Sequence, residues 1–477
     1  MKRSKKFLAG VLAAAMSLSM LAGCTGGDTS SPASSGDSEP SSQTQQSGGE
    51  ISFKFWTAPE QYNLDFWTKY AEKFNAAGVQ LDGKTIKVEV QMMPAQPSSE
   101  AGIQNGIATG TIPAVSENIN RNFAGTLADS QAVYDIANED WFKAIVAERK
   151  LESIMEGWAI GDAQYVVPLY VNPPTIMYNS KALKELGVTK VPETTAEFTD
   201  LLNKYKEKAA DLKGDGVTHF FLRPELVKPA DWWERWFDFT TLYYAFSGGK
   251  AIVDGDKLVA TKDDVKKVFD FYGQMGSSLL TGDVQDAWNQ DTVQMVCGIS
   301  LPWNVAPMTA AGKEYGMDKD YIVGPNPVEK AGDTSYCFAD SKGLVFYKNA
   351  AVSDEQHNAA VEFVKWVMTD GGKDTFDTDW LESTAMLPVR GDIDTNANVQ
   401  AYFEKNPAMK DIASYVANAI PCMENPKMSD IYTKMAEQGL TPYITEQVAN
   451  AEIGATPDSS SYVDKAMSAM KEAGSLQ

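Results

Sequence analysis

From Ile51 onward, apolar positions alternate between the period of a strand and the period of a helix. Ile51, Phe53 and Phe55 alternate with polar residues, which predicts a strand, and apolar residues at helical spacing over 64–74 predict a helix after it. A second strand and a second helix follow within residues 86–109. Because strands alternate with helices, the pattern predicts an α/β fold with layers of parallel sheet.

Two later helices carry a signal at their first residues. Thr194 with Glu197, and Ser353 with Gln356, have the spacing of a capping box, and each pair precedes an amphipathic run. Residues 252–259 predict a hairpin, and helical patterns dominate the C-terminal part of the chain. We find no internal repeat of the period that solenoid proteins show.

The first 50 residues have a different pattern. Met1–Lys6 is basic, residues 7–20 are apolar, and Leu21-Ala22-Gly23-Cys24 follows at once. The apolar run is short for a membrane span and ends in small residues, which is typical of an export signal. Residues 25–50 contain no large apolar side chain, so they predict a flexible tether of Ser, Gly and Gln.

The Leu-Ala-Gly-Cys sequence resembles the lipobox of bacterial lipoproteins, in which the Cys is acylated and becomes the new N-terminus. The resemblance implies that residues 1–23 are a signal peptide and that Cys24 carries lipid. An ordinary secretory signal with an incidental Cys is the alternative.

Length and charge narrow the class of protein. A chain of 477 residues is long for one core, so we expect two lobes or domains. The formal net charge of −22 argues against a nucleic-acid partner, because binding phosphates needs basic side chains. With two histidines, His-rich zinc sites are disfavoured, and we expect no metal and no cofactor. Cys297, Cys337 and Cys422 can form at most one disulfide, and the sequence leaves open whether they form any.

Seven short segments, in order over residues 51–392, carry a family resemblance. They are Phe55-Trp56-Thr57, residues 108–115, residues 164–172, residues 177–183, Gly298 with Pro302-Trp303, residues 321–325, and Leu387-Pro388-Val389-Arg390. Their order and spacing resemble the sugar-binding group of extracellular solute-binding proteins of ABC importers, the group that includes maltose-binding protein. Ala114 departs from the pattern, since the family usually has Asp there.

The resemblance implies a two-lobed fold of the periplasmic-binding-protein type, with hinge-linked lobes and a ligand cleft between them. The expected division is 51–170 with 344–385 for the first lobe, 171–336 with 392–477 for the second, and crossings near 170–173, 336–343 and 385–392. A ligand that contacts both lobes favours the closed state because it binds that state more tightly.

The function implied is capture of a carbohydrate, with an oligosaccharide expected, and delivery to the membrane permease subunits of an ABC importer. The protein would be lipid-anchored on the extracellular face of the bacterial cell membrane. Which sugar it binds, and how many units, the sequence leaves open.

Sugars present apolar ring faces and dense hydroxyls, so their sites need exposed aromatic rings and planar polar groups. Trp56 ends a strand, where it either meets ligand or packs in the core. Trp303 matches the stacking Trp of the family, and Trp380 precedes the last crossing. Trp232 is chosen from the three Trp residues over 232–236, although the sequence does not say which of them faces the cleft.

Polar candidates follow the strands or lie beside the crossings. They are Glu60, Asn118, Asn120, Arg121, Asn172, Asn304 and Arg390, together with Tyr170. Arg is suited to this role because its rigid fork pairs with adjacent hydroxyls. For Asn120 and Arg121, helix capping and solvation are the alternatives.

Two other classes of function compete with this interpretation. A secreted glycosidase needs only two carboxylates, but no pair stands at strand ends within a motif, so we predict no catalytic residue and no enzyme. A surface adhesion lipoprotein would have the same tether, but it would not explain the ordered motifs at the crossings. Among binding proteins, the Trp content favours sugar over iron or a polyamine.

Overall fold

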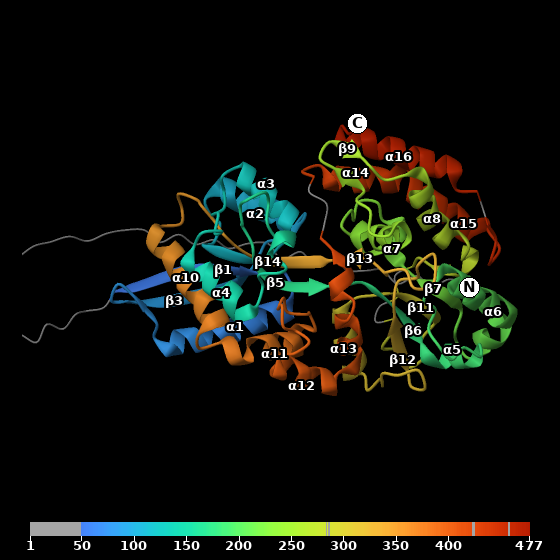
Figure 1. Cartoon of the computed structure of the whole chain (residues 1–477), viewed down its shortest axis with the longest axis horizontal. Coiled ribbons are helices and arrows are strands. Elements are labelled where there is room, and N and C mark those ends of the chain that lie inside the picture. The colour runs from blue at the N-terminus through green and yellow to red at the C-terminus, as the bar shows by residue number, and fades with distance from the viewer. Residues whose placement is uncertain (1–48, 283, 285–286, 422–424, 457) are drawn as a thin grey trace, which may run out of the picture. The chain divides into compact units, whose positions relative to one another are not determined.

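The structure is a computed structural model that describes residues 49–282, 284, 287–421, 425–456 and 458–477 (Figure 1). The predicted signal peptide, the lipid-attachment residue Cys24 and nearly all of the tether lie outside the described residues, as does Cys422. Cys297 and Cys337 are buried free thiols. In the described part of the chain, no helix has the length and apolar character needed to cross a membrane.

The first sheet has six strands in the order β2-β3-β1-β4-β14-β5. Their bounds are β1 Glu50–Thr57, β2 Gln80–Leu81, β3 Lys84–Met92, β4 Val115–Ile119, β5 Val167–Asn172 and β14 Asp340–Phe346. The helices of this lobe are α1 Gln61–Ala77, α2 Ser99–Thr109, α3 Arg121–Asp129, α4 Asp140–Arg149, α10 Asp354–Thr369 and α11 Lys373–Thr384. Helix α1 packs on β3 and α10 packs on β1, which buries an aromatic core between sheet and helices.

The second sheet has five strands in the order β10-β7-β11-β6-β12. Their bounds are β6 Thr175–Asn179, β7 His219–Leu222, β10 Leu279–Leu280, β11 Met295–Ser300 and β12 Tyr321–Gly324. The helices are α5 Ser180–Glu185, α6 Thr195–Gly214, α7 Thr241–Ser247, α8 Lys262–Gly273, α9 Val305–Ala310, α12 Ala397–Lys405, α13 Pro407–Ala413, α14 Met428–Met435, α15 Thr441–Asn450 and α16 Ser460–Gly474. Residues of α14, α15 and α16 share one core with those of α6, α7 and α8.

Short elements complete the fold. Two small strand pairs are β8 Val253–Asp254 with β9 Lys257–Leu258, and β13 Cys337–Phe338 with β15 Ala419–Ile420. The 3-10 turns are η1 Met155–Gly157, η2 Pro224–Val227, η4 Gly276–Ser278, η5 Pro302–Asn304 and η6 Val416–Asn418, and the π-helical turns are η3 Trp236–Thr240 and η7 Ala436–Leu440.

The sequence signals for helix ends and for the hairpin are confirmed. Helix α1 ends at Gly78, which has a φ of 64°, a conformation that glycine adopts without a steric penalty. Both capping boxes form, at Thr194 in α6 and at Ser353 in α10. The predicted hairpin is the β8–β9 pair.

The α/β class with parallel strands is confirmed, but each large sheet also contains one antiparallel strand in addition to the edge strand β2. Strand β14 runs antiparallel to β4 and β5, and β6 runs antiparallel to β11 and β12. Each of these strands begins where the chain arrives from the other sheet. Because the arriving chain enters at the edge where the parallel strands end, it must run in the opposite direction.

The chain passes between the two sheets at three places. Strand β5 ends at Asn172 in the first sheet and β6 begins at Thr175 in the second. Strands β13 and β14 return the chain to the first sheet, and a third segment pairs with β5 through Val171 N–H to Leu387 O at 2.9 Å. At the edge where the parallel strands end, Ser300 of β11 lies opposite Thr175. The carboxyl edges of both sheets are therefore next to these passages.

Candidate ligand-binding site

The first half of the candidate site is the carboxyl edge of the first sheet, where the parallel strands β1, β3 and β4 end. Glu117 of β4 is fully buried there, and its Oε1 accepts hydrogen bonds from Ala58 N–H at 2.8 Å and Asn63 Nδ2 at 3.0 Å. Burial raises the pKa of Glu117 to about 7, although these two hydrogen bonds act in the opposite direction. Ligands of open α/β sheets bind outside this edge.

Asn118, the next residue of β4, has a strained backbone and an engaged side chain. Its φ is 68°, in the left-handed region that few residues other than glycine adopt. Its Oδ1 accepts from Lys342 Nζ at 2.9 Å and from the Tyr170 hydroxyl at 3.3 Å. Such strained residues cluster at functional sites. The half-buried amide of Asn118 is therefore held in one position at the edge.

Two further groups, the carboxyl of Asp340 and the phenol of Tyr62, lie close to the carboxylates of the same edge. Asp340, at the start of β14, is buried and lies 3.9 Å from Lys342 Nζ, and burial raises its pKa. Burial, followed by the charges of Glu60, Glu117 and Asp340, raises the pKa of the half-buried Tyr62. The Tyr62 phenol therefore keeps its proton and can donate a hydrogen bond.

The second half of the site is a pocket of about 330 Å³ at the carboxyl edge of the second sheet. Its lining includes Arg223 and Glu225, which follow β7, and Trp303 and Asn304, which follow β11. This volume is at the lower end of the range for small-molecule sites. The strands approach closely because β11 has a glycine at Gly298, where a Cβ would lie 2.9 Å from the carbonyl oxygen of β7's last residue.

A buried ion-pair network forms one wall of this pocket. Arg223 contacts Glu234 at 2.5 Å, Glu225 at 3.3 Å and Asp238 at 3.6 Å, and Arg235 contacts Asp238 at 2.8 Å. Burial acts to lower the pKa of Arg223, but the surrounding carboxylates raise it overall. Burial raises the pKa of Glu234. Arg223 therefore stays charged inside the protein.

Aromatic rings form the other wall and continue toward the passages between the sheets. We call Trp232, Trp236, Phe237, Trp303 and Phe338 the aromatic cluster. Trp236 stacks on Phe338 with ring centroids 5.1 Å apart, and Phe237 meets Trp303 edge-on at 6.0 Å. Trp232 and Trp303 are partly exposed, so each presents ring surface to a ligand.

The two halves of the site meet on one strand segment. Phe338 of β13 belongs to the aromatic cluster, and Asp340 of β14 belongs to the polar edge of the first sheet. Two residues of extended chain span roughly 7 Å. A ligand seated beside this segment can therefore touch the aromatic cluster and the polar edge together.

Several residues predicted from the sequence lie in this region. Asn118 and Tyr170 are bonded to each other at the first edge, while Trp303 and Asn304 line the pocket and Trp232 contacts Trp236 of the aromatic cluster. Asn304 Oδ1 accepts from Leu301 N–H at 2.9 Å, which fixes the turn that presents Trp303.

Three predicted ligand residues are placed elsewhere by the structure. Trp380 has 0% exposure and lies among the rings of the first core, 4.9 Å from that of Phe66. Trp56 has 6% exposure and fits against Gly106. Arg390 pairs with Asp377 and Asp392. Trp56 and Trp380 pack in the core and Arg390 is paired with two carboxylates, so we remove all three from the candidate site.

The remaining predicted residues have local structural roles. Asn120 Oδ1 caps α3 by accepting from Phe123 N–H at 2.8 Å, which is the alternative that the sequence left open, and Arg121 Nε donates to a backbone carbonyl at 2.7 Å. Asn172 is fully buried between the passages, donating to Asp340 at 3.4 Å. Glu60 is exposed just before α1.

Sequence reasoning missed residues that the structure brings into the site, among them Glu117, Asp340, Lys342, Arg223 and Glu225. Asp340 and Lys342 lie inside the predicted crossing 336–343, so these two positions carried a usable signal, whereas Arg223 and Glu225 follow β7, a strand that we did not predict. Glu117 had none, because its place in a buried strand predicts an apolar residue.

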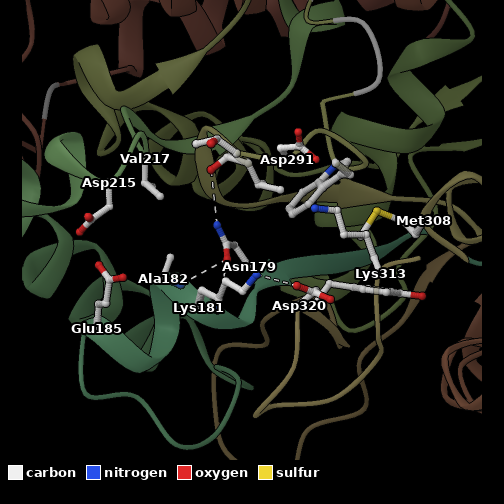
Figure 2. A pocket seen from close by; sticks show the side chains of 14 residues that line it. Asn179, Lys181, Ala182, Glu185, Asp215, Val217, Asp291, Met308, Lys313 and Asp320 are labelled. Carbon is white, nitrogen blue, oxygen red and sulfur yellow. Dashed lines mark hydrogen bonds and ion pairs between the residues drawn. The ribbon is translucent and has the colours of Figure 1, made fainter. Parts of the chain in front are cut away.

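A second pocket, of about 200 Å³, lies around the start of α5 (Figure 2). Asn179 Oδ1 accepts from Lys181 N–H at 3.1 Å and its Nδ2 donates to Met295 O at 3.3 Å, while Lys181 pairs with Asp320 at 2.7 Å. These polar groups are engaged in capping α5 and in joining it to the sheet. We therefore place the candidate site at the pocket beside Trp303.

The fold and the paired edges define a two-lobed binding protein of the periplasmic-binding-protein type. A family profile described as bacterial extracellular solute-binding protein matches residues 69–410. The chain therefore belongs to the bacterial extracellular solute-binding proteins, a family of binding proteins rather than enzymes. A search of curated protein sequences gave no match.

Solved structures with the same fold cover nearly the whole described chain. An uncharacterized protein from Listeria monocytogenes is 30% identical, with a TM-score of 0.71 over 89% of this chain and 98% of that one. The cyclic α-maltosyl-1,6-maltose binding protein of Arthrobacter globiformis is 16% identical, with a TM-score of 0.65 over 89% and 99%. UgpB of Mycobacterium tuberculosis, solved with glycerophosphocholine, is 15% identical, with a TM-score of 0.65 over 89% and 98%.

Proposed function

We propose that this protein captures an oligosaccharide between the two sheet edges and delivers it to the permease subunits of an ABC importer. The observation that carries the proposal is the pocket at the end of β7 and β11. It combines the partly exposed ring of Trp303 with the amide of Asn304 and the carboxylate of Glu225. Rings cover the apolar faces of a sugar, and amides and carboxylates pair with its hydroxyls.

Closure of the lobes around the ligand is the signal in this proposal. A sugar that lies on Trp303 and also reaches the amide of Asn118 makes its full set of contacts only when the edges approach each other. Its affinity for the closed state is then higher, so binding shifts the population toward that state. The permease would distinguish loaded from empty protein by this change.

The proposed location follows from the N-terminal residues rather than from the fold. An export signal over residues 1–23 would direct the chain across the membrane, and lipid on Cys24 with a tether that has no large apolar residue would hold the binding lobes at the extracellular face of the cell membrane. One acyl chain binds a membrane only weakly, so a stable anchor needs at least two chains on Cys24.

The proposal is tested by titrating the purified protein with maltotriose, cellotriose, xylotriose and mannotriose in a calorimeter. We expect one of these probes to bind with one site per chain, to raise the melting temperature by mass action, and to be recovered intact. Small-angle scattering should show compaction on binding. A protein that binds none of the four but binds spermidine or a ferric chelate would refute the carbohydrate assignment, and recovery of shortened sugars would favour a glycosidase.

A further inference from the structure

Among the described residues that line the pocket beside Trp303, carboxylates outnumber cations, and this bears on which sugar the pocket accepts. Two guanidinium groups, Arg223 and Arg235, share the network with the carboxylates of Glu225, Glu234 and Asp238. The network therefore has an excess of one negative charge when all five groups are ionised. Both guanidinium groups are already held by carboxylates, at 2.5 Å in the case of Arg223 and Glu234.

At the first edge, the amine of Lys342 is likewise engaged. Its Nζ lies 3.9 Å from Asp340 and donates to Asn118 Oδ1 at 2.9 Å. An anionic group of a ligand would have to compete with both contacts.

Two buried polar atoms of the network, Arg223 Nε and Glu225 Oε2, make no hydrogen bond to the described residues. Each nevertheless faces an opposite charge, since Arg223 Nε lies 3.6 Å from Asp238 and Glu225 Oε2 lies 3.3 Å from the Arg223 guanidinium. A guanidinium N–H can only donate and a carboxylate oxygen can only accept. A sugar hydroxyl can donate to the Glu225 carboxylate, whose side chain is 25% exposed, and leave these ion pairs in place. Hydrogen bonds to charged groups are the stronger ones.

An anionic group on the sugar would weaken binding to this pocket. To pair with it, Arg223 would have to give up its contacts with Glu234 and Glu225, and these carboxylates would then be buried without a counter-charge. Breaking a buried pair in this way is strongly unfavourable. A hydroxyl can bind without breaking the ion pairs of Arg223 with Glu234 and Glu225.

Resting on the proposed function, we propose that Arg223, Glu225 and Glu234 are the specificity-determining residues of this pocket. They accept an uncharged, hydroxyl-bearing sugar ring and exclude a ring that carries a carboxylate or a phosphate. The substrate class is accordingly neutral oligosaccharides, and acidic ones such as uronates are rejected.

The test compares a neutral hexose trisaccharide from the panel above (maltotriose, cellotriose or mannotriose) with the same trisaccharide after oxidation of its primary hydroxyls to carboxylates. We expect the wild-type protein to bind the neutral form at least about tenfold more tightly. Glu234→Gln removes one negative charge from the network and keeps a similar shape, so the ratio of the two affinities should fall severalfold. Glu225→Gln, at a side chain that is 25% exposed, should act in the same direction and gives a second measurement where Glu234→Gln loses stability.

The matched control is Glu355→Gln, which removes an equal charge from an exposed pair with Lys84 on the first lobe. It should leave the ratio unchanged. Equal or tighter binding of the oxidised trisaccharide by the wild type would overturn the inference while leaving the proposed function intact. A ratio that Glu234→Gln and Glu225→Gln change no more than the control would also overturn it. Binding of neither form would refute the proposed function and the inference with it.

Discussion

Replacement of Glu117 by Gln should change how the stability of the protein depends on pH. Glu117 is a fully buried carboxyl whose Oε1 accepts from Ala58 N–H and from the amide of Asn63. The amide oxygen of Gln can accept the same two hydrogen bonds, so the substitution removes the titration and keeps the geometry. This makes Glu117→Gln a clean perturbation of one ionisable group.

The direction and size of the effect follow from the pKa. Burial raises the pKa of Glu117 from 4.5 to about 7 in the folded protein. Between these two values the unfolded chain has lost the proton and the folded chain still holds it, so the free energy of unfolding falls as pH rises. A difference of about 2.5 pH units corresponds to about 3 kcal/mol at 1.36 kcal/mol per unit. Below pH 4.5 this contribution is fully present, and above about pH 7 it is lost.

The assay is urea unfolding without ligand, followed by tryptophan fluorescence at several pH values from 4 to 8 for wild type and variant. Other groups titrate in this range, so the quantity to compare is the difference between the two free energies of unfolding. We expect it to move by about 3 kcal/mol in favour of Glu117→Gln as pH rises. Glu355→Gln, an exposed replacement of equal charge, should show no comparable trend.

Two outcomes would refute this reasoning. A difference that stays constant from pH 4 to pH 8 would mean that Glu117 does not titrate in this window. A trend of opposite sign would mean that the folded protein stabilises the ionised carboxylate, with Lys342 as the nearby positive charge.

Three further predictions concern separate parts of the molecule. Trp303→Ala should weaken oligosaccharide binding by about tenfold in calorimetry with little change in melting temperature, because the Trp303 ring is partly exposed beside the pocket. Trp380→Ala should instead lower the free energy of unfolding by about 3–5 kcal/mol, because the Trp380 ring is fully buried. The reverse pattern would exchange the roles of the two residues. Asn172→Ala should lower the free energy of unfolding by about 2 kcal/mol or more, since Asp340 and the Leu387 N–H each lose a buried partner, and unchanged urea unfolding would contradict this. Cys24→Ser should release the protein from the membrane fraction into the medium, and acylated N-terminal peptide should vanish in mass spectrometry; continued membrane association would argue against lipid on Cys24.

Signals that depend on neighbours along the chain were sufficient to predict the local structure. Helix ends such as Gly78 and the capping boxes at Thr194 and Ser353 follow from hydrogen bonds and dihedral angles within a few residues. The alternation of strands and helices predicted the α/β class for the same reason. The order of the short motifs was also sufficient to predict the family, because the order of motifs can be read from the sequence without the structure.

Only the tertiary structure decided which rings and charges meet a ligand. Trp56, Trp303 and Trp380 are similar from the sequence, but Trp380 is enclosed by helices and strands distant in the chain while Trp303 stays partly exposed. Glu117 and Arg223 became visible as site residues only when distant segments surrounded them. Burial and the pKa values it changes are sums over contacts between distant segments, so no local pattern of residues could reveal them.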